Sequence, residues 1–192
     1  MKKLNLCQSQ NPWHGKWIWA EGNGQEKNVY YYFRKVFSLK DCLGSYRLLI
    51  SADTRYQLFV NGTFIQRGPP QSQPYYQYYD EHEVERVLHR GENCIAVLVN
   101  HVGNVADARG GLLLELLNGN NKPVVYTDPS WRVRHAEAWR QDTHAVRMNV
   151  ATPYQEFYDA RDEIAGWRET DFDDSDWAHA RIVPGRVSDR PP

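Results

Sequence analysis

The chain has 192 residues, enough for one domain with its own hydrophobic core. It carries 23 basic and 24 acidic side chains, a net charge of −1, and so has no basic surplus to attract nucleic acid. The three cysteines cannot all pair with one another, and no apolar run indicates a signal peptide or a membrane span. We therefore expect a cytoplasmic protein without a membrane partner.

In chain order, the sequence predicts short strands separated by turn residues. Residues 1–15 are expected to be an N-terminal arm, 16–184 the domain and 185–192 a linker or tail. The expected strands are 16–19, 29–39, 46–50, 56–60, 64–65, 94–99, 112–117, 124–126 and 131–133. Residues 71–80 and 100–110 are predicted loops, and 81–89 a short helix or a strand with its linker.

The fold class follows from this spacing. Strands roughly 8–12 residues apart, without a long amphipathic helix, are typical of an all-β antiparallel sandwich or jelly roll. Residues 94–99 are apolar at every position, which indicates an inner strand buried on both faces. Asn61-Gly62 predicts a two-residue hairpin turn, because both residues tolerate positive φ. Its role is expected to be structural.

The predicted loop at 100–110 is the first candidate site. A rigid strand would position it, and its amide, imidazole, carboxylate and guanidinium groups suit the hydroxyls of a sugar. These groups belong to Asn100, His101, Asn104, Asp107 and Arg109. The alternative is a solvated loop in which Arg109 pairs with Asp107.

A second candidate site comprises Arg67-Gly68-Pro69-Pro70 and the tyrosines that follow, which are Tyr75, Tyr76, Tyr78 and Tyr79. Arg67, Tyr76 and Tyr78 are its expected sugar-contacting residues. Tyrosine rings stack on pyranose C–H faces, while their hydroxyls bond to the rim of the sugar. The alternative is that alternate tyrosines fill the edge of the sandwich.

Acidic residues offer weaker candidates. FDDSDW (172–177) holds oxygen ligands of the kind calcium prefers, but aspartate and serine also close turns. Glu156 with Asp159, or Glu163 with Asp162, could be read as the two catalytic carboxyl groups of a glycosidase. Nothing in the sequence defines the distance between the two carboxyl groups that such a pair requires. We assign no catalytic residue, no metal ligand and no cofactor, and keep calcium as an alternative.

One resemblance rests on the order of several phrases. They are FRKVF, FVNG with RGPP, GENCIAVLVNHVG, RGGLLLELL, DPSWRV, QEFYDAR and FDDSDW, within 17–183. This order resembles the N-terminal region of bacterial α-L-rhamnosidases of glycoside hydrolase family 78, which implies a galactose-binding-like jelly roll. In that family, hydrolysis of terminal α-L-rhamnose with inversion uses acids on a separate α/α-toroid domain. No segment of this sequence is similar to that domain.

The resemblance implies a non-catalytic accessory domain of an α-L-rhamnosidase. Its expected partners are a rhamnose-containing carbohydrate and the catalytic domain of the parent enzyme. One alternative is a purely structural or interaction module that binds no sugar. Another is a self-sufficient glycosidase.

Overall fold

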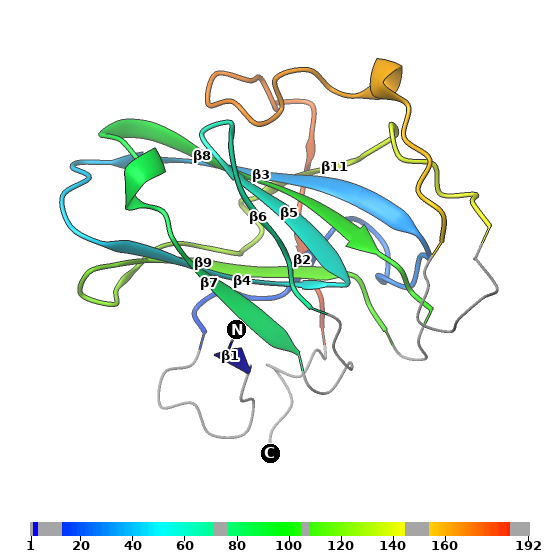
Figure 1. Ribbon diagram of the computed structural model, residues 1–192, viewed down its shortest axis with the longest axis horizontal. Coiled ribbons are helices and arrows are strands. Elements are labelled where there is room, and N and C mark those ends of the chain that lie inside the picture. The colour runs from blue at the N-terminus through cyan, green and yellow to red at the C-terminus, as the bar shows by residue number, and fades with distance from the viewer. Residues whose placement is uncertain (1, 4–12, 71–76, 105–107, 145–153, 185–192) are drawn as a thin grey trace.

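The protein consists of two antiparallel β-sheets packed face to face (Figure 1). The computed structural model describes residues 2–3, 13–70, 77–104, 108–144 and 154–184. The predicted all-β sandwich is therefore confirmed. Within the described ranges, no helix is long and apolar enough to cross a membrane.

The first sheet has seven strands. Its order is β1 (Lys2–Lys3), β7 (Tyr78–Glu83), β4 (Tyr46–Asp53), β9 (Gly111–Asn118), β2 (Ile18–Trp19) and β13 (Arg181–Ile182), and β10 (Pro123–Tyr126) also pairs with β9. Residues 2–3 belong to the stretch expected to be an arm, yet they pair with β7.

The second sheet has six strands. Its order is β12 (Ala178–His179), β11 (Arg132–His135), β3 (Val29–Leu39), β8 (Gly91–His101), β5 (Arg55–Val60) and β6 (Thr63–Gly68). The two long central strands, β3 and β8, stay in register from Val29 opposite His101 to Leu39 opposite Gly91. Two single turns of 3₁₀ helix, η1 (Glu85–Val87) and η2 (Ala160–Asp162), complete the elements of the described residues.

Two predicted loops are partly strands. Asn100 and His101 extend β8, because their backbone continues the pairing with β3 after the apolar run has ended. Tyr78, Tyr79 and Asp80 begin β7, a strand with half-buried side chains that lies between β4 and the two-residue β1. Pairing with a neighbouring strand outweighs local composition in both places.

Period-two alternation makes the six-stranded sheet apolar on both faces, as the sequence predicted for its inner strand. One set of β8 side chains fills the core between the sheets, and the other set lies in a second cluster on the outer face. The two sets are Ile95, Val97 and Val99, and Cys94, Ala96 and Leu98.

The C-terminal part of the chain supplies the cover for that outer face. The rings of Trp167 and Trp177 lie 4.4 and 6.0 Å from that of Tyr32, with Ala136 in the same cluster. We call the described residues 136–144 and 154–177 the covering segment. The six-stranded sheet is thus the middle of three layers.

Candidate functional site

The outer face of the six-stranded sheet is lined by two rows of side chains near the C-terminal end of β8. Residues directly opposite one another on antiparallel strands share a face and lie close together. One row contains Arg55, Asn100 and Tyr30, and the next contains Arg67, Gln57 and Leu98.

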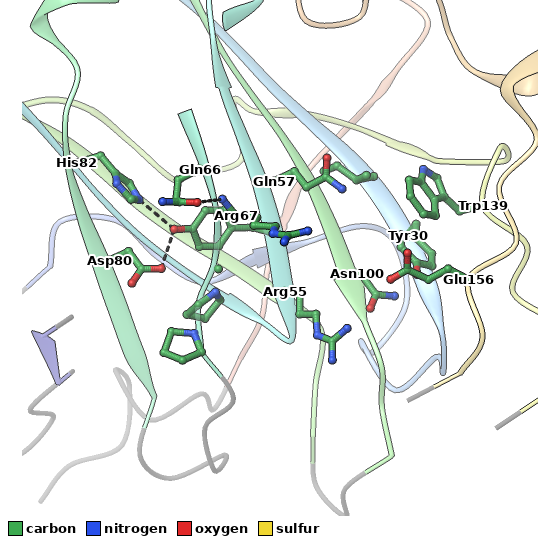
Figure 2. A pocket seen from close by; sticks show the side chains of 15 residues that line it. Tyr30, Arg55, Gln57, Gln66, Arg67, Asp80, His82, Asn100, Trp139 and Glu156 are labelled. Atoms are coloured by element: carbon green, nitrogen blue, oxygen red, sulfur yellow. Dashed lines mark hydrogen bonds between the residues drawn. The ribbon is translucent and has the colours of Figure 1, made fainter. Parts of the chain in front are cut away.

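A cleft with a volume of about 660 Å³ opens over these rows (Figure 2). This size falls within the range of roughly 300–1,000 Å³ that is usual for small-molecule sites. The cleft extends around the β5–β6 edge to β7. Its lining comprises the two rows together with Tyr56, Gln66, Gly68, Pro69, Pro70, Asp80, His82, Trp139 and Glu156.

The β7 end of the cleft is organised by a buried tyrosine. The Tyr56 hydroxyl donates to Asp80 Oδ2 at 2.7 Å and lies 3.0 Å from His82 Nε2. Because the one hydroxyl proton goes to the carboxylate, Nε2–H of His82 donates to the Tyr56 oxygen. Gly68 leaves room for this contact, since a Cβ there would lie 2.3 Å from Asp80 Oδ2.

Burial controls the ionisation of this cluster. It raises the pKa of Tyr56, and the hydrogen bond to Asp80 raises it further. Burial also lowers the pKa of His82, partly offset by the Asp80 charge. At neutral pH, Tyr56 is therefore a protonated donor and His82 an uncharged imidazole.

The opposite end of the cleft has an aromatic wall. The rings of Tyr30 and Trp139 stack with centroids 4.7 Å apart, and Tyr158 lies 4.8 Å beyond Trp139. Trp139 is therefore held by a stacked ring, that of Tyr30, and by a tilted one, that of Tyr158. The apolar part of the lining consists of Tyr30, Trp139, Leu98 and the two prolines.

Charged side chains line the centre and the far rim. Arg55, Arg67 and Glu156 are exposed, and among the described residues neither arginine side chain has a hydrogen-bond or ion-pair partner. Burial raises the pKa of the Tyr30 hydroxyl; Glu156 raises it further and Arg55 opposes the shift. The cleft thus presents donors and acceptors around a small apolar floor, an arrangement suited to a polyhydroxylated ligand.

Comparison with known families gives one match over most of the domain. Residues 43–189 match the model of the α-L-rhamnosidase N-terminal domain. The chain belongs to this family.

Curated relatives are themselves α-L-rhamnosidases. One from Formosa agariphila is 25% identical over 92% of this chain, and one from Streptomyces avermitilis is 26% identical over 87%. The chain covers only 21% and 14% of these two proteins. It therefore spans about a fifth or less of their length.

Among solved structures, too, the chain is similar to part of a longer rhamnosidase. The family 78 rhamnosidase of Bacillus sp. GL1 superposes with a TM-score of 0.81 at 35% identity, over 90% of this chain and 18% of that one. A lectin from Pleurotus ostreatus, solved with GalNAc, superposes with a TM-score of 0.56 at 21% identity, over 88% of this chain and 41% of that one. The lectin shows a shared sandwich fold.

In this rhamnosidase N-terminal domain, the first predicted site does not form one surface. Asn100 faces the cleft, whereas the adjacent His101 points into the sandwich and is fully buried, with Nδ1 3.3 Å from Asp53 Oδ1. Asn104 is exposed outside the cleft lining, and Arg109 donates to the Pro184 carbonyl at 3.3 Å. Asp107 lies outside the described residues, so its expected pairing with Arg109 stays a prediction.

The second predicted site contributes the run Arg67-Gly68-Pro69-Pro70 to the cleft, and Arg67 is the only one of its three expected sugar-contacting side chains that the described residues place there. Tyr78 is half-buried on β7 without lining the cleft, and Tyr76 lies outside the described residues. The sequence reasoning missed most of the other lining residues as sugar-contacting groups. Register would have found Arg55, Gln57 and Tyr30, because they lie beside Asn100 and Arg67 in the two rows.

The acidic candidates have structural partners. Asp174 pairs with Arg34 and Asp176 with Arg134, while Asp173 accepts the Ser175 amide hydrogen at 3.0 Å. Within the described part of the chain, no group of three His, Cys, Asp or Glu side chains could hold a metal ion.

The imagined glycosidase pairs are also explained by the fold. Asp159 accepts from the Arg161 amide at the start of η2. Glu163 accepts from the Tyr32 hydroxyl at 2.7 Å and from Trp167 Nε1 at 2.8 Å. Glu156 lines the cleft, but Asp159 does not.

Proposed function

We propose that this domain is a non-catalytic carbohydrate-binding module of an α-L-rhamnosidase, and that rhamnose-containing glycans bind in the cleft on the outer face of the six-stranded sheet. The observation that carries the proposal is the cleft itself, which joins polar groups of two sheets to an apolar floor in a member of the rhamnosidase N-terminal family. The cytoplasmic location belongs to the same proposal and rests on cysteine use.

The chemistry of the lining supports sugar rather than a purely apolar ligand. Asn100 and Gln57 offer amide donors and acceptors on central strands, where the sheet limits their freedom. Asp80 and Glu156 offer acceptors for hydroxyl protons at the two ends. Leu98 and Pro69 supply apolar surface for the C–H groups of a pyranose.

The test is calorimetric titration of the intact chain with L-rhamnose and with rhamnosylated oligosaccharides, neutral and acidic. Each titration is run with calcium and then with chelator. We expect saturable binding that a non-rhamnosyl sugar of equal size does not reproduce. Retention of the binding heat in chelator would exclude calcium as a required ligand.

Sugar binding to the variant Gln57→Leu tests whether the cleft is the binding site, and Gln57 is the residue chosen. Its side chain is half-buried in the cleft, so the substitution removes hydrogen bonds to the sugar and should weaken binding about threefold to tenfold. Asn120→Leu is the matched control, an amide-to-aliphatic change in the exposed turn after β9, at the opposite end of the sandwich from Asn100. Equal affinity in both variants, with unchanged melting temperatures, would place the sugar elsewhere. No heat with any rhamnosyl sugar would instead favour a module that only packs against a catalytic domain.

A further inference from the structure

We infer that the cleft selects an acidic glycan, with Arg55 and Arg67 holding a negatively charged substituent of the saccharide. This inference rests on the proposed function and specifies the class of sugar. It begins from two guanidinium groups that have no hydrogen-bond or ion-pair partner within the described chain. Both residues line the cleft.

Arginines elsewhere on the six-stranded sheet are neutralised by carboxylates. Arg34 on β3 pairs with Asp174 at 2.9 Å, and Arg134 on β11 pairs with Asp176 at 2.5 Å. The two cleft arginines depart from this pattern although the cleft contains two acidic side chains. Asp80 is engaged by Tyr56 at the β7 end, and Glu156 lies at the opposite rim beside Tyr30.

The register brings the two arginines together. Arg67 on β6 lies opposite Gln57 on β5, and Arg55 is two positions before Gln57 on the same face. Diagonal neighbours of this kind have backbones about 7–8 Å apart, which long side chains span easily. Two unneutralised like charges at this spacing repel each other, and an anion bound between them would remove that cost.

The position of the charges also sets the order of groups in the ligand. Figure 2 shows Arg55 and Arg67 in the middle of the cleft, between the Asp80–His82 end and the Asn100–Glu156 end. The anionic group therefore belongs at the centre, where a guanidinium can form paired hydrogen bonds to a carboxylate or sulfate. Neutral hydroxyls belong at the two ends, where they can donate to Asp80 and Glu156.

The test compares three probes by calorimetric titration of the intact chain: a rhamnosyl-glucuronic acid disaccharide, the matching rhamnosyl-glucose disaccharide and L-rhamnose sulfate. We expect at least one acidic probe to bind about tenfold or more tighter than the neutral disaccharide, with the preference shrinking as salt rises. Tighter binding of the uronic acid identifies a carboxylate ligand, and tighter binding of the sulfate identifies a sulfate ester.

Arg55→Gln and Arg67→Gln, singly and together, should abolish this preference, because they weaken binding of the acidic probe about tenfold more than binding of the neutral disaccharide. Arg90→Gln is the matched control, because Arg90 is exposed beside the other end of β8. Equal affinity for neutral and acidic probes, or a preference that survives both substitutions, would overturn the inference and leave the proposed function standing. Absence of binding to all three probes would overturn both.

Discussion

Arg34 shows how a single residue attaches one layer of the protein to another. Its side chain is fully buried, and Nε donates to Asp174 Oδ2 at 2.9 Å. The guanidinium also donates to the carbonyls of Trp167, Glu169 and Phe172. All four partners belong to the covering segment, so a strand residue organises a region that has little regular secondary structure.

We predict that Arg34→Met lowers the free energy of unfolding by about 3–5 kcal/mol, because Asp174 and the carbonyls lose their shared donor in a largely buried setting. Arg134→Met, which breaks the exposed pair with Asp176, should cost about 1 kcal/mol or less. Urea unfolding of both variants measures the difference. Similar losses in the two would show that the buried arginine does not anchor the covering segment.

At the scale of elements, the β5–β6 hairpin is held in two ways, by the backbone conformation of its turn and by the side chain of Asn61. Asn61 and Gly62 have φ values of 49° and 74°, as the predicted two-residue turn requires. The Asn61 side chain also donates to the Val87 carbonyl and to Asn93 Oδ1, both at 2.8 Å, and accepts from the Cys94 amide at 2.7 Å. The turn thus fixes the hairpin against β8 and the η1 region.

Asn61→Gly separates these two roles, because glycine keeps the backbone conformation and loses the side-chain bonds. We expect the free energy of unfolding to fall by about 1–3 kcal/mol. Asn121→Gly, at an exposed turn residue with φ of 58°, should change it by no more than about 0.5 kcal/mol. Denaturant titration of the pair decides whether backbone shape alone is sufficient.

The strands could be predicted from the sequence because their side chains alternate. The cleft could not be predicted, because its lining residues come from several separate segments of the chain. The apolar run at 94–99 ends before β8 does, so Asn100 and His101 were expected in one loop although they face opposite sides of the sheet. Following the alternation two residues further would have separated them. The positions of Trp139 and Glu156 depend on how the covering segment packs, and that segment has no periodic pattern to reveal it.

At the scale of the whole molecule, buried tyrosines link the stability of the layers to pH. Burial raises the pKa of Tyr30, Tyr32 and Tyr56 above the ordinary value of 10.0. Below pH 10 these phenols are protonated in both the folded and the unfolded chain. Above pH 10 only the unfolded chain releases the protons, so the free energy of unfolding falls as pH rises.

We predict that the melting temperature drops steeply above pH 10 and that buried tyrosinate absorbance appears together with unfolding. Tyr56→Phe should make the drop shallower, because one of the shifted groups is gone. Tyr126→Phe, at an exposed ring, is the control and should leave the slope unchanged. Ionisation of all tyrosines before any loss of structure would contradict this account.

The long β3–β8 pairing has a consequence for the order in which the chain folds. It joins Val29 to His101 and Leu39 to Gly91, segments that are separated by the whole of β4 to β7. Closing such distant pairs costs loop entropy before any contact compensates for it, which slows folding in proteins with this topology. The local β5–β6 hairpin can form early and present β5 as a template for β8. The floor of the cleft is then assembled late, when β3 joins that pair and the covering segment closes over it.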